Sequence, residues 1–314
     1  MKKLSLLIAF VMLFTSISFA NEKEEVKPMV LEGKKAVLLV SFGTTHKDTT
    51  KVTIDAMMNI LKNEFEGFEV RKAYTSRMIM KILKNRDNII VLNPSEALTK
   101  LKEDGFKHVV VQPTHIINGL EAEYLEEEIS AFKNDFETLK LGSSLLTMPN
   151  DYKETAKAIK SQINKELKED EAVVLMGHGT HHPGNSAYAM MNYVFNNMDM
   201  KNVYLGTVEG YPEFEDVVKN LKADGKKKVT LMPFMLVAGD HAKNDMASDE
   251  EDSWKSMLEK EGFEVEIYLH GLGENEMIQK IFVSHAKEAL INEEEDVAKM
   301  KANIANSKDE EESK

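Results

Sequence analysis

The 314-residue sequence predicts an α/β fold made of two similar, Rossmann-like domains, each built on a parallel sheet and related by internal duplication. Two observations support this prediction. The chain contains two weakly similar halves whose matching segments follow in the same order, and in each half short apolar runs alternate with helical stretches. Alternation of strand and helix is typical of parallel sheets with right-handed crossover connections.

The internal repeat is visible in three pairs of segments. "AVLLVSFGTTH" at 36–46 matches "AVVLMGHGTHH" at 172–182, and both contain Gly-Thr-x-His. "LKEDGFKHVVVQPTHIINGLE" at 101–121 matches "LKADGKKKVTLMPFMLVAGDH" at 221–241, with a proline at the same place and a glycine six residues after it. Between these pairs, "FEVRKAYTS" corresponds in shape to "KNVYLGTVE". Matches of this length in the same order indicate gene duplication.

Each half contains four predicted strands, short and rich in Val, Leu and Ile, as expected of strands covered on both faces. Those of the first half are Ala36–Val40, Glu69–Tyr74, His108–Gln112 and Thr138–Leu141. Those of the second half are Ala172–Met176, Asn202–Thr207, Lys228–Met232 and Glu264–Leu269. Helices between the strands are predicted at Lys51–Phe65, Tyr152–Leu167 and Glu213–Ala223, among others. An Asp-Gly pair before the third strand of each half serves as a helix stop and turn.

These elements divide the chain into an N-terminal α/β domain at 36–146 and a C-terminal α/β domain at 147–273. A last helix at 274–290 follows "GLGEN" and could pack back onto the N-terminal domain. Residues 292–314 are polar, charged and almost free of large apolar side chains, so we expect a disordered acidic tail.

The first twenty residues have the layout of a secretory signal peptide. Lys2 and Lys3 form a basic start, the apolar stretch 6–14 follows, and Ser18-Phe19-Ala20 offers small residues for cleavage. The apolar stretch is too short to span a bilayer. We therefore expect an exported, periplasmic protein without a membrane span after cleavage; an uncleaved anchor is the alternative.

Composition restricts the chemistry. The formal net charge is −13, which argues against binding to nucleic acid because phosphate backbones repel an acidic chain. The chain has no cysteine, which excludes disulfides, thiolate nucleophiles and cysteine zinc sites. Any metal must therefore be bound by His, Asp or Glu. The sequence leaves the oligomeric state open, and a homo-oligomer is possible.

Three potential metal ligands fall at strand ends of the second half. His178 follows its first strand, Glu209 its second, and the segment after the third strand leads to His241. Ligands of open parallel sheets bind beyond the carboxyl ends of the strands, and neighbouring strands lie roughly 4.8 Å apart, so these side chains can converge. Two imidazoles and one carboxylate make an open site for a borderline divalent cation.

The first half provides an internal comparison for these three residues. In the alignment of the halves the equivalent positions are occupied by Phe42, Ser76 and Glu121. The first half therefore kept the scaffold without the ligand set. This asymmetry is difficult to explain if the three residues merely suit a strand end.

Other residues near these strand ends have several interpretations. His181 and His182 could orient the ligands, capture metal, or be exposed loop residues, and His115 could line the crevice from the opposite domain. The acidic run 240–252 could be a solvated face or an acidic mouth that concentrates cations. Tyr188, with the methionines near it, could form the wall for a large flat conjugated ligand.

Several segments together resemble the anaerobic cobalt chelatases, that is, the sirohydrochlorin cobaltochelatase family of the early-insertion cobalamin route, within the class II chelatases. The resemblance covers about residues 36–290 and is most specific in the fifth segment. The segments are "LLVSFGTTHKDT", "QPTHIINGLE", "GHGTHHPGNSAYAMMNY", "VEGYPE", "LMPFMLVAGDHAKNDMASDEEDSWK" and "GLGENEMI".

The resemblance implies ATP-independent insertion of Co²⁺ into sirohydrochlorin with release of two protons, as part of cobalamin biosynthesis. It also implies that the family's His-Glu-His metal set falls on His178, Glu209 and His241. Fe²⁺ or Ni²⁺ could replace Co²⁺, since the same N/O ligands accept them. Arg77, directly after Ser76 at the second strand end, is a candidate cation for the substrate's carboxylates. Because cobalamin synthesis is cytoplasmic, the export signal raises the alternative of a haem, tetrapyrrole or metal carrier on the same scaffold.

Overall fold

The computed structural model describes residues 31–291, so the predicted signal peptide and acidic tail lie outside the described residues. Within this range, no helix is both long and apolar enough to cross a membrane.

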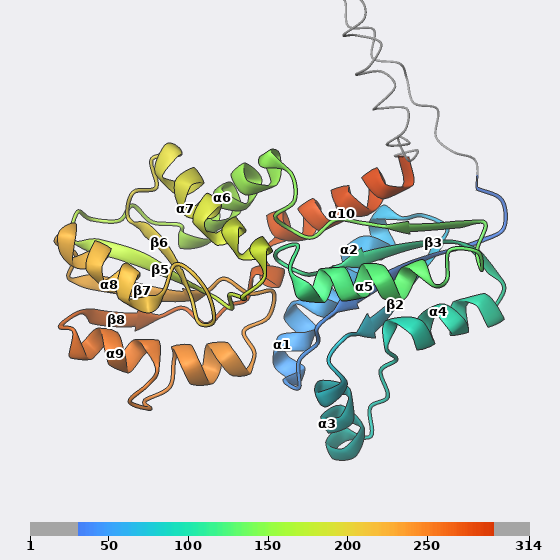
Figure 1. Cartoon of the computed structure of the whole chain (residues 1–314), viewed down its shortest axis with the longest axis horizontal. Coiled ribbons are helices and arrows are strands. Elements are labelled where there is room, and N and C mark those ends of the chain that lie inside the picture. Colours follow the sequence, from blue (N-terminus) through green and yellow to red (C-terminus); the bar gives the residue numbers. More distant parts are fainter. Residues whose placement is uncertain (1–30, 292–314) are drawn as a thin grey trace, which may run out of the picture.

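The described chain forms two four-stranded parallel sheets, which confirms the predicted fold class (Figure 1). The first sheet has the strand order β2-β1-β3-β4 and the second has the order β6-β5-β7-β8. The strands of the first sheet are β1 (Lys34–Ser41), β2 (Phe68–Tyr74), β3 (Phe106–Pro113) and β4 (Thr138–Leu141). Those of the second are β5 (Glu171–Gly177), β6 (Val203–Thr207), β7 (Lys228–Pro233) and β8 (Glu264–Ile267).

The strand register supports the duplication independently of residue type. In the first sheet Val37 pairs with Val70 of β2 and with Val110 of β3. In the second sheet the equivalent Val173 pairs with Val203 and Thr230, which are the residues aligned with those two valines. The two halves therefore share strand order, direction and register, so equivalent positions in the sequence occupy equivalent places in space.

Helices cover both faces of each sheet. In the N-terminal half they are α1 (Lys47–Val52), α2 (Ile54–Glu64), α3 (Arg77–Asp87), α4 (Pro94–Glu103) and α5 (Leu120–Ser130). The C-terminal half contains α6 (Pro149–Ile163), α7 (Ser186–Asn197), α8 (Phe214–Ala223) and α9 (Trp254–Lys260), and the last helix, α10 (Glu276–Ile291), lies against the N-terminal half. Short helical turns are η1 (Pro183–Asn185), η2 (Ala242–Met246, a π-helix) and η3 (Leu272–Glu274).

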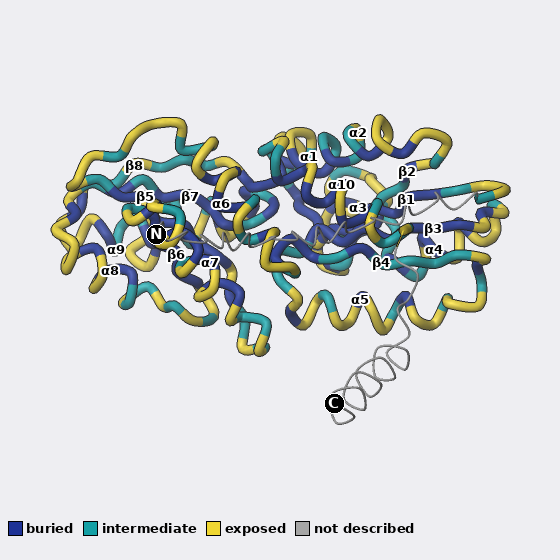
Figure 2. The backbone as a smooth tube through the Cα atoms, turned by 90° about the horizontal axis from the view of Figure 1, so that it is seen from above, coloured by how far each residue is buried: buried dark blue, intermediate teal, exposed yellow. Residues whose placement is uncertain are grey.

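Alternate strand residues face different cores, as the two-residue period of a strand requires. Val37, Leu39, Val173 and Leu175 belong to one large central core to which both halves contribute, together with α2, α6, α7 and α10. The residues between them face outer cores, under α4 and α5 in the first half and under α8 and α9 in the second. Figure 2 shows this buried interior running through both halves.

The last helix, α10, packs against β3, β4 and α2 of the N-terminal half and against α6. Its His285 is buried, with Nδ1 3.2 Å from the carbonyl oxygen of Ser143 and Nε2 3.2 Å from Asp151. Asp151 in turn accepts the backbone N–H of Met148. The C-terminal helix thus fixes the segment that connects the two halves.

Two predicted helices have different limits in the structure. The stretch predicted at 51–65 forms α1 and α2, separated at Thr53, whose hydroxyl donates back to the carbonyl oxygen of Thr49. Such back-bonding bends helices. The stretch predicted at 152–167 begins at Pro149 and ends at Ile163, because Asn164 adopts the left-handed conformation that terminates helices.

Candidate metal centre

The structure places the three predicted metal ligands next to one another at the carboxyl edge of the second sheet. The imidazole rings of His178 and His241 lie with their centroids 4.7 Å apart at an interplanar angle of 88°. The carboxylate Oε2 of Glu209 lies 3.9 Å from Nδ1 of His178. The sheet order explains the proximity, since β5 is flanked by β6 and β7.

The backbone around His178 ties two of these positions together. Its carbonyl oxygen accepts the N–H groups of Val208 and Glu209, at 3.1 and 2.8 Å. Gly179 has a φ of +82°, and a Cβ there would lie 2.7 Å from the backbone nitrogen of Gly210. The glycine after His178 therefore permits both the left-handed turn and the close approach of the Glu209 loop.

The hydrogen bonds of the two imidazoles select one tautomer. Nδ1 of His178 lies 2.9 Å from the carbonyl oxygen of Gly179, and Nδ1 of His241 lies 2.5 Å from the carboxylate of Asp245. Both partners are acceptors, so Nδ1 donates in each case and Nε2 of the neutral ring keeps its lone pair. A histidine whose Nδ1–H donates to a carbonyl or carboxylate is the usual metal ligand.

The donor atoms of the three side chains do not converge on one point. Among residues 31–291, no group of three or more His, Cys, Asp or Glu side chains is arranged to hold a metal ion. Glu209 lies on the Nδ1 side of His178, whereas the free lone pair is on Nε2. The three side chains must therefore rotate before they can bind one ion together. They are free enough to do so, since the exposed fractions of His178, Glu209 and His241 are 46%, 56% and 45%.

Asp245 is a residue of this centre that the sequence analysis did not single out. It lies within the π-helix η2, one turn beyond His241. In the sequence Asp245 belongs to the acidic run 240–252, and its i+4 spacing from His241 is the signal that points to it. Single π turns are frequent at functional sites, which agrees with the placement of His241 here.

Arg77 begins α3 and is exposed. The structure shows no ion pair or hydrogen bond of its guanidinium with any residue between 31 and 291. By contrast, Arg71 pairs with Glu69 and Asp104, and Arg86 pairs with Asp87. Within residues 31–291, Arg77 is therefore the arginine whose guanidinium has no partner in the structure.

His115 follows β3 in the N-terminal half, and both its ring nitrogens are buried without a hydrogen-bond partner. Burial lowers the pKa of this imidazole from 6.5 to about 4. The ring is consequently neutral at neutral pH. Its approach to a ligand stays a prediction.

Tyr188 of α7 is buried beneath the loop of His178. A Cβ on Gly177 would lie 2.7 Å from its ring, and the ring packs edge-on against Phe234 with centroids 6.2 Å apart. Burial raises the pKa of its hydroxyl to about 12. In this structure Tyr188 supports the strand end, and its contact with a ligand stays a prediction.

The carboxyl edges of both sheets also expose large apolar side chains, an exposure that the sequence pattern did not predict. Phe42, which occupies the position equivalent to His178, is 49% exposed, and Val208 and Tyr211 flank Glu209 with exposures of 37% and 60%.

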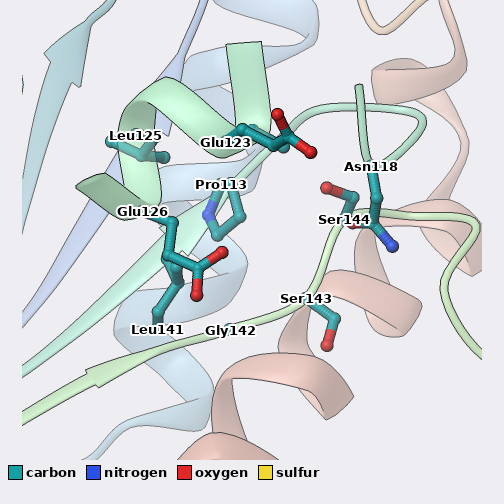
Figure 3. A pocket seen from close by; sticks show the side chains of 10 residues that line it. Pro113, Asn118, Glu123, Leu125, Glu126, Leu141, Gly142, Ser143 and Ser144 are labelled. Carbon is teal, nitrogen blue, oxygen red and sulfur yellow. The ribbon is translucent and has the colours of Figure 1, made fainter. Parts of the chain in front are cut away.

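A hollow of about 420 Å³ lies in the N-terminal half, beside α5 and the loop after β4 (Figure 3). Glu123 and Glu126 project from α5 over the loop that carries Ser143 and Ser144. None of the predicted site residues lines this hollow.

Comparison with known proteins places these residues in a wider context. Residues 35–291 match the family model described as cobalt chelatase (CbiK). A sirohydrochlorin cobaltochelatase of Salmonella typhimurium is 41% identical over 257 residues, which is 82% of this chain and 97% of that protein. The sirohydrochlorin cobaltochelatase CbiKC of Nitratidesulfovibrio vulgaris is 33% identical, over 82% of this chain and 91% of that protein.

Solved structures share the fold at low sequence identity. SirB from Bacillus subtilis, solved with Fe³⁺, superposes with a TM-score of 0.59 at 15% identity, covering 82% of this chain and 96% of that one. CbiX, described as the terminal enzyme of sirohaem biosynthesis in denitrifying bacteria, gives 0.52 at 12% identity, covering 81% and 99%.

Asp245→Ala should weaken Co²⁺ binding about tenfold, because the Nδ1–H of His241 loses the acceptor that orients the ring. Asp245→Asn keeps an acceptor oxygen and should recover part of the affinity. Titration calorimetry of the purified protein measures this. Asp249→Ala, in the same acidic run but paired with Lys255, is the matched control. Equal losses in both alanine variants would contradict an orienting role.

Acid should destabilise the protein through His115. Folding lowers the pKa of this imidazole, so the unfolded chain binds the proton first as the pH falls from about 6.5 towards 4. Over this range the free energy of unfolding falls by about 1.4 kcal/mol per pH unit. The stability is complete above pH 6.5 and is lost on acidification. His115→Met introduces the residue that the second half has at the equivalent position, Met235, and should flatten this part of the pH dependence. Denaturant unfolding from pH 7 to pH 4 tests it, and parallel curves for the two proteins would refute it.

Proposed function

The chain belongs to the cobalt chelatase (CbiK) family, and from this premise we propose that it inserts Co²⁺ into sirohydrochlorin. The observation that supports this most strongly is the pair of imidazoles with free Nε2 atoms beside Glu209. Such a group binds a borderline divalent cation through nitrogen and oxygen, which are the donors that Co²⁺ accepts.

We propose that His178, Glu209 and His241 hold the incoming Co²⁺ only transiently. A chelatase must take up a hydrated cation and then give it up to the four nitrogens of the macrocycle. Closed sites with four protein ligands hold metal for structural purposes, whereas open sites leave positions for exchange. The half-exposed side chains and their unconverged donor atoms fit such a delivery site.

Insertion also releases two protons from the pyrrole nitrogens, which balance the two positive charges of the cation. Acceptors must lie within hydrogen-bond reach of those nitrogens. The free Nε2 lone pairs of His178 and His241 and the carboxylate of Glu209 are basic groups of the proposed metal centre itself. We propose that they accept the protons as the metal leaves them.

We propose that the macrocycle lies between the carboxyl edges of the two sheets. Phe42 and Val208 provide exposed apolar surface for its flat face, one from each half. Sirohydrochlorin carries many carboxylates, and Arg77, which has no ion pair with residues 31–291, offers a cation for one of them.

Metal preference and location are further proposals. The same N/O ligands accept Co²⁺, Ni²⁺ and Fe²⁺, so the ligand set alone does not choose among them; we propose Co²⁺ on the strength of the family. We also propose export to the periplasm, on the basis of the basic and apolar residues of the first twenty positions, which lie outside the described residues.

Replacing either histidine should abolish most of the reaction. His178→Ala or His241→Ala should lower the rate of cobalt insertion about 100-fold or more, the scale on which positioned acid–base groups act. The purified mature protein is mixed with sirohydrochlorin and Co²⁺, Ni²⁺ or Fe²⁺, and the visible spectrum is followed. His270→Ala, an exposed histidine paired with Glu274, is the control. Stoichiometric binding of the macrocycle without turnover would instead indicate a tetrapyrrole carrier.

Arg77→Ala should raise KM for sirohydrochlorin about three- to tenfold through loss of a charge-assisted hydrogen bond, with little change in kcat. Steady-state kinetics with saturating Co²⁺ measure the two constants separately. Lys219→Ala removes an exposed cation from α8 and is the comparison. An unchanged KM in Arg77→Ala would exclude this residue from substrate binding.

A further inference from the structure

The repeated Gly-Thr-x-His motif, at 43–46 and at 179–182, has a role that the metal centre does not explain. The two copies have the same local structure. Each begins with a glycine of positive φ, +95° in the first and +82° in the second. In each, the threonine hydroxyl accepts the histidine N–H two residues later, at 3.2 and 3.1 Å. The motif therefore fixes the direction in which its histidine leaves the strand end.

Both histidines reach across to the opposite half of the molecule. Nε2 of His46 lies 2.8 Å from Oδ1 of Asp240 in the C-terminal half. Nε2 of His182 lies 3.0 Å from Oε1 of Glu123 in the N-terminal half. The residues of the first pair lie 194 positions apart in the sequence and those of the second pair 59. In each pair the histidine follows the first strand of one half and the carboxylate follows the third strand of the other half. The arrangement is reciprocal, as expected of two similar halves facing each other about a pseudo-twofold axis.

The backbone packing around the two pairs is reciprocal as well. A Cβ on Gly239 would lie 3.6 Å from Oγ1 of Thr44, and a Cβ on Gly119 would lie 3.9 Å from Cγ2 of Thr180. These are equivalent residues in the alignment of the halves. A Cβ on Gly184 would lie 2.2 Å from the carbonyl oxygen of Asn118, so the halves touch closely at the second pair.

The hydrogen bonds of His182 show which atom donates in its contact with Glu123. Its Nδ1 accepts the backbone N–H of Gly184 at 3.0 Å. In the neutral ring Nε2 must therefore carry the proton and donate it to Glu123. The ring bridges a fixed backbone donor and the carboxylate of the other half, which neither a lysine nor a carboxylate could do.

Each connection is adjacent to one of the proposed metal ligands. Asp240 directly precedes His241, and His182 lies four residues after His178. We propose that the two His–carboxylate pairs, His46–Asp240 and His182–Glu123, are straps that hold the carboxyl edge of the N-terminal half over the two metal-binding histidines. His46 and His182 are thus positioning residues.

The expected effect on catalysis rests on the proposed function, whereas the effect on the arrangement of the halves does not. Exposed ion pairs are individually weak. Glu123 and Asp240 are each more than half exposed, so the straps can set the spacing of the halves and still yield when a macrocycle enters.

The absence of cysteine from the chain allows a direct test. Cysteines introduced at the exposed Asn63 of α2 and Asn220 of α8 carry spin labels, and pulsed electron paramagnetic resonance gives the distance distribution between the halves. His182→Ala and Glu123→Ala should each shift or broaden this distribution, and the double variant should add nothing further. Glu123→Gln keeps an acceptor for the Nε2 proton and should restore the original distribution. Lys222→Ala, which breaks an exposed pair with Glu261 inside the C-terminal half, should leave it unchanged.

Kinetics of the same variants supply the second measurement. His182→Ala should raise KM for sirohydrochlorin about fivefold, with kcat changed less than about twofold, since a weak exposed pair is lost while the ligands remain. Thermal unfolding checks that each variant is folded. If His182→Ala does not fold, Glu123→Ala, which changes an exposed residue, replaces it in both measurements. A distance distribution that is unchanged in both alanine variants would overturn the strap proposal, whatever the activity. A wild-type protein that shows no turnover would refute the proposed function, and the distances would still decide on the straps.

Discussion

The parallel pairing of β5 with β6 on one side and β7 on the other is the constraint on which the candidate centre depends. Because all three strands end at the same edge, His178, Glu209 and His241 come together although 63 residues separate the first from the last. The carbonyl oxygen of His178 then binds the N–H groups of the Glu209 loop, so the position of one ligand fixes the backbone of another. Glycine at 179 is required for that approach, which gives the Gly-His-Gly sequence a steric explanation.

Comparison of the two halves distinguishes the residues that the fold requires from those that belong to the candidate centre. Strand order and register are the same in both halves, yet Phe42 and Ser76 stand where the second half has His178 and Glu209. Ser76 has a structural task, since its hydroxyl accepts the N–H of Ile79 and caps α3. Phe42 is left half exposed. Both edges thus expose apolar side chains, but of the two positions only those of the second half carry an imidazole and a carboxylate.

The strands could be predicted from the sequence, whereas several side-chain contacts of the site could not. The strand predicted at 172–176 is observed at 171–177, because strands buried on both faces have an unmistakable apolar pattern. The proximity of His178 and Glu209 followed from parallel topology, whereas the position of His241 also depends on the loop between β7 and η2. The hydrogen bond between His46 and Asp240 could not be predicted, since it joins segments 194 residues apart and depends on how the halves pack. The orientation of Glu209 towards Nδ1 of His178 is likewise a side-chain detail that no pattern encodes.

The histidines of this chain share one physical property, which is that a neutral imidazole donates at one nitrogen and accepts at the other. His178 and His241 donate through Nδ1 to a fixed acceptor and keep the Nε2 lone pair for a cation. His182 uses the opposite tautomer, accepting a backbone N–H at Nδ1 and donating across the halves through Nε2. Two of the histidines in the loop after β5, 178 and 182, therefore differ in tautomer because their backbone partners differ. The partner of Nδ1 decides which ring nitrogen of each of these histidines keeps its lone pair.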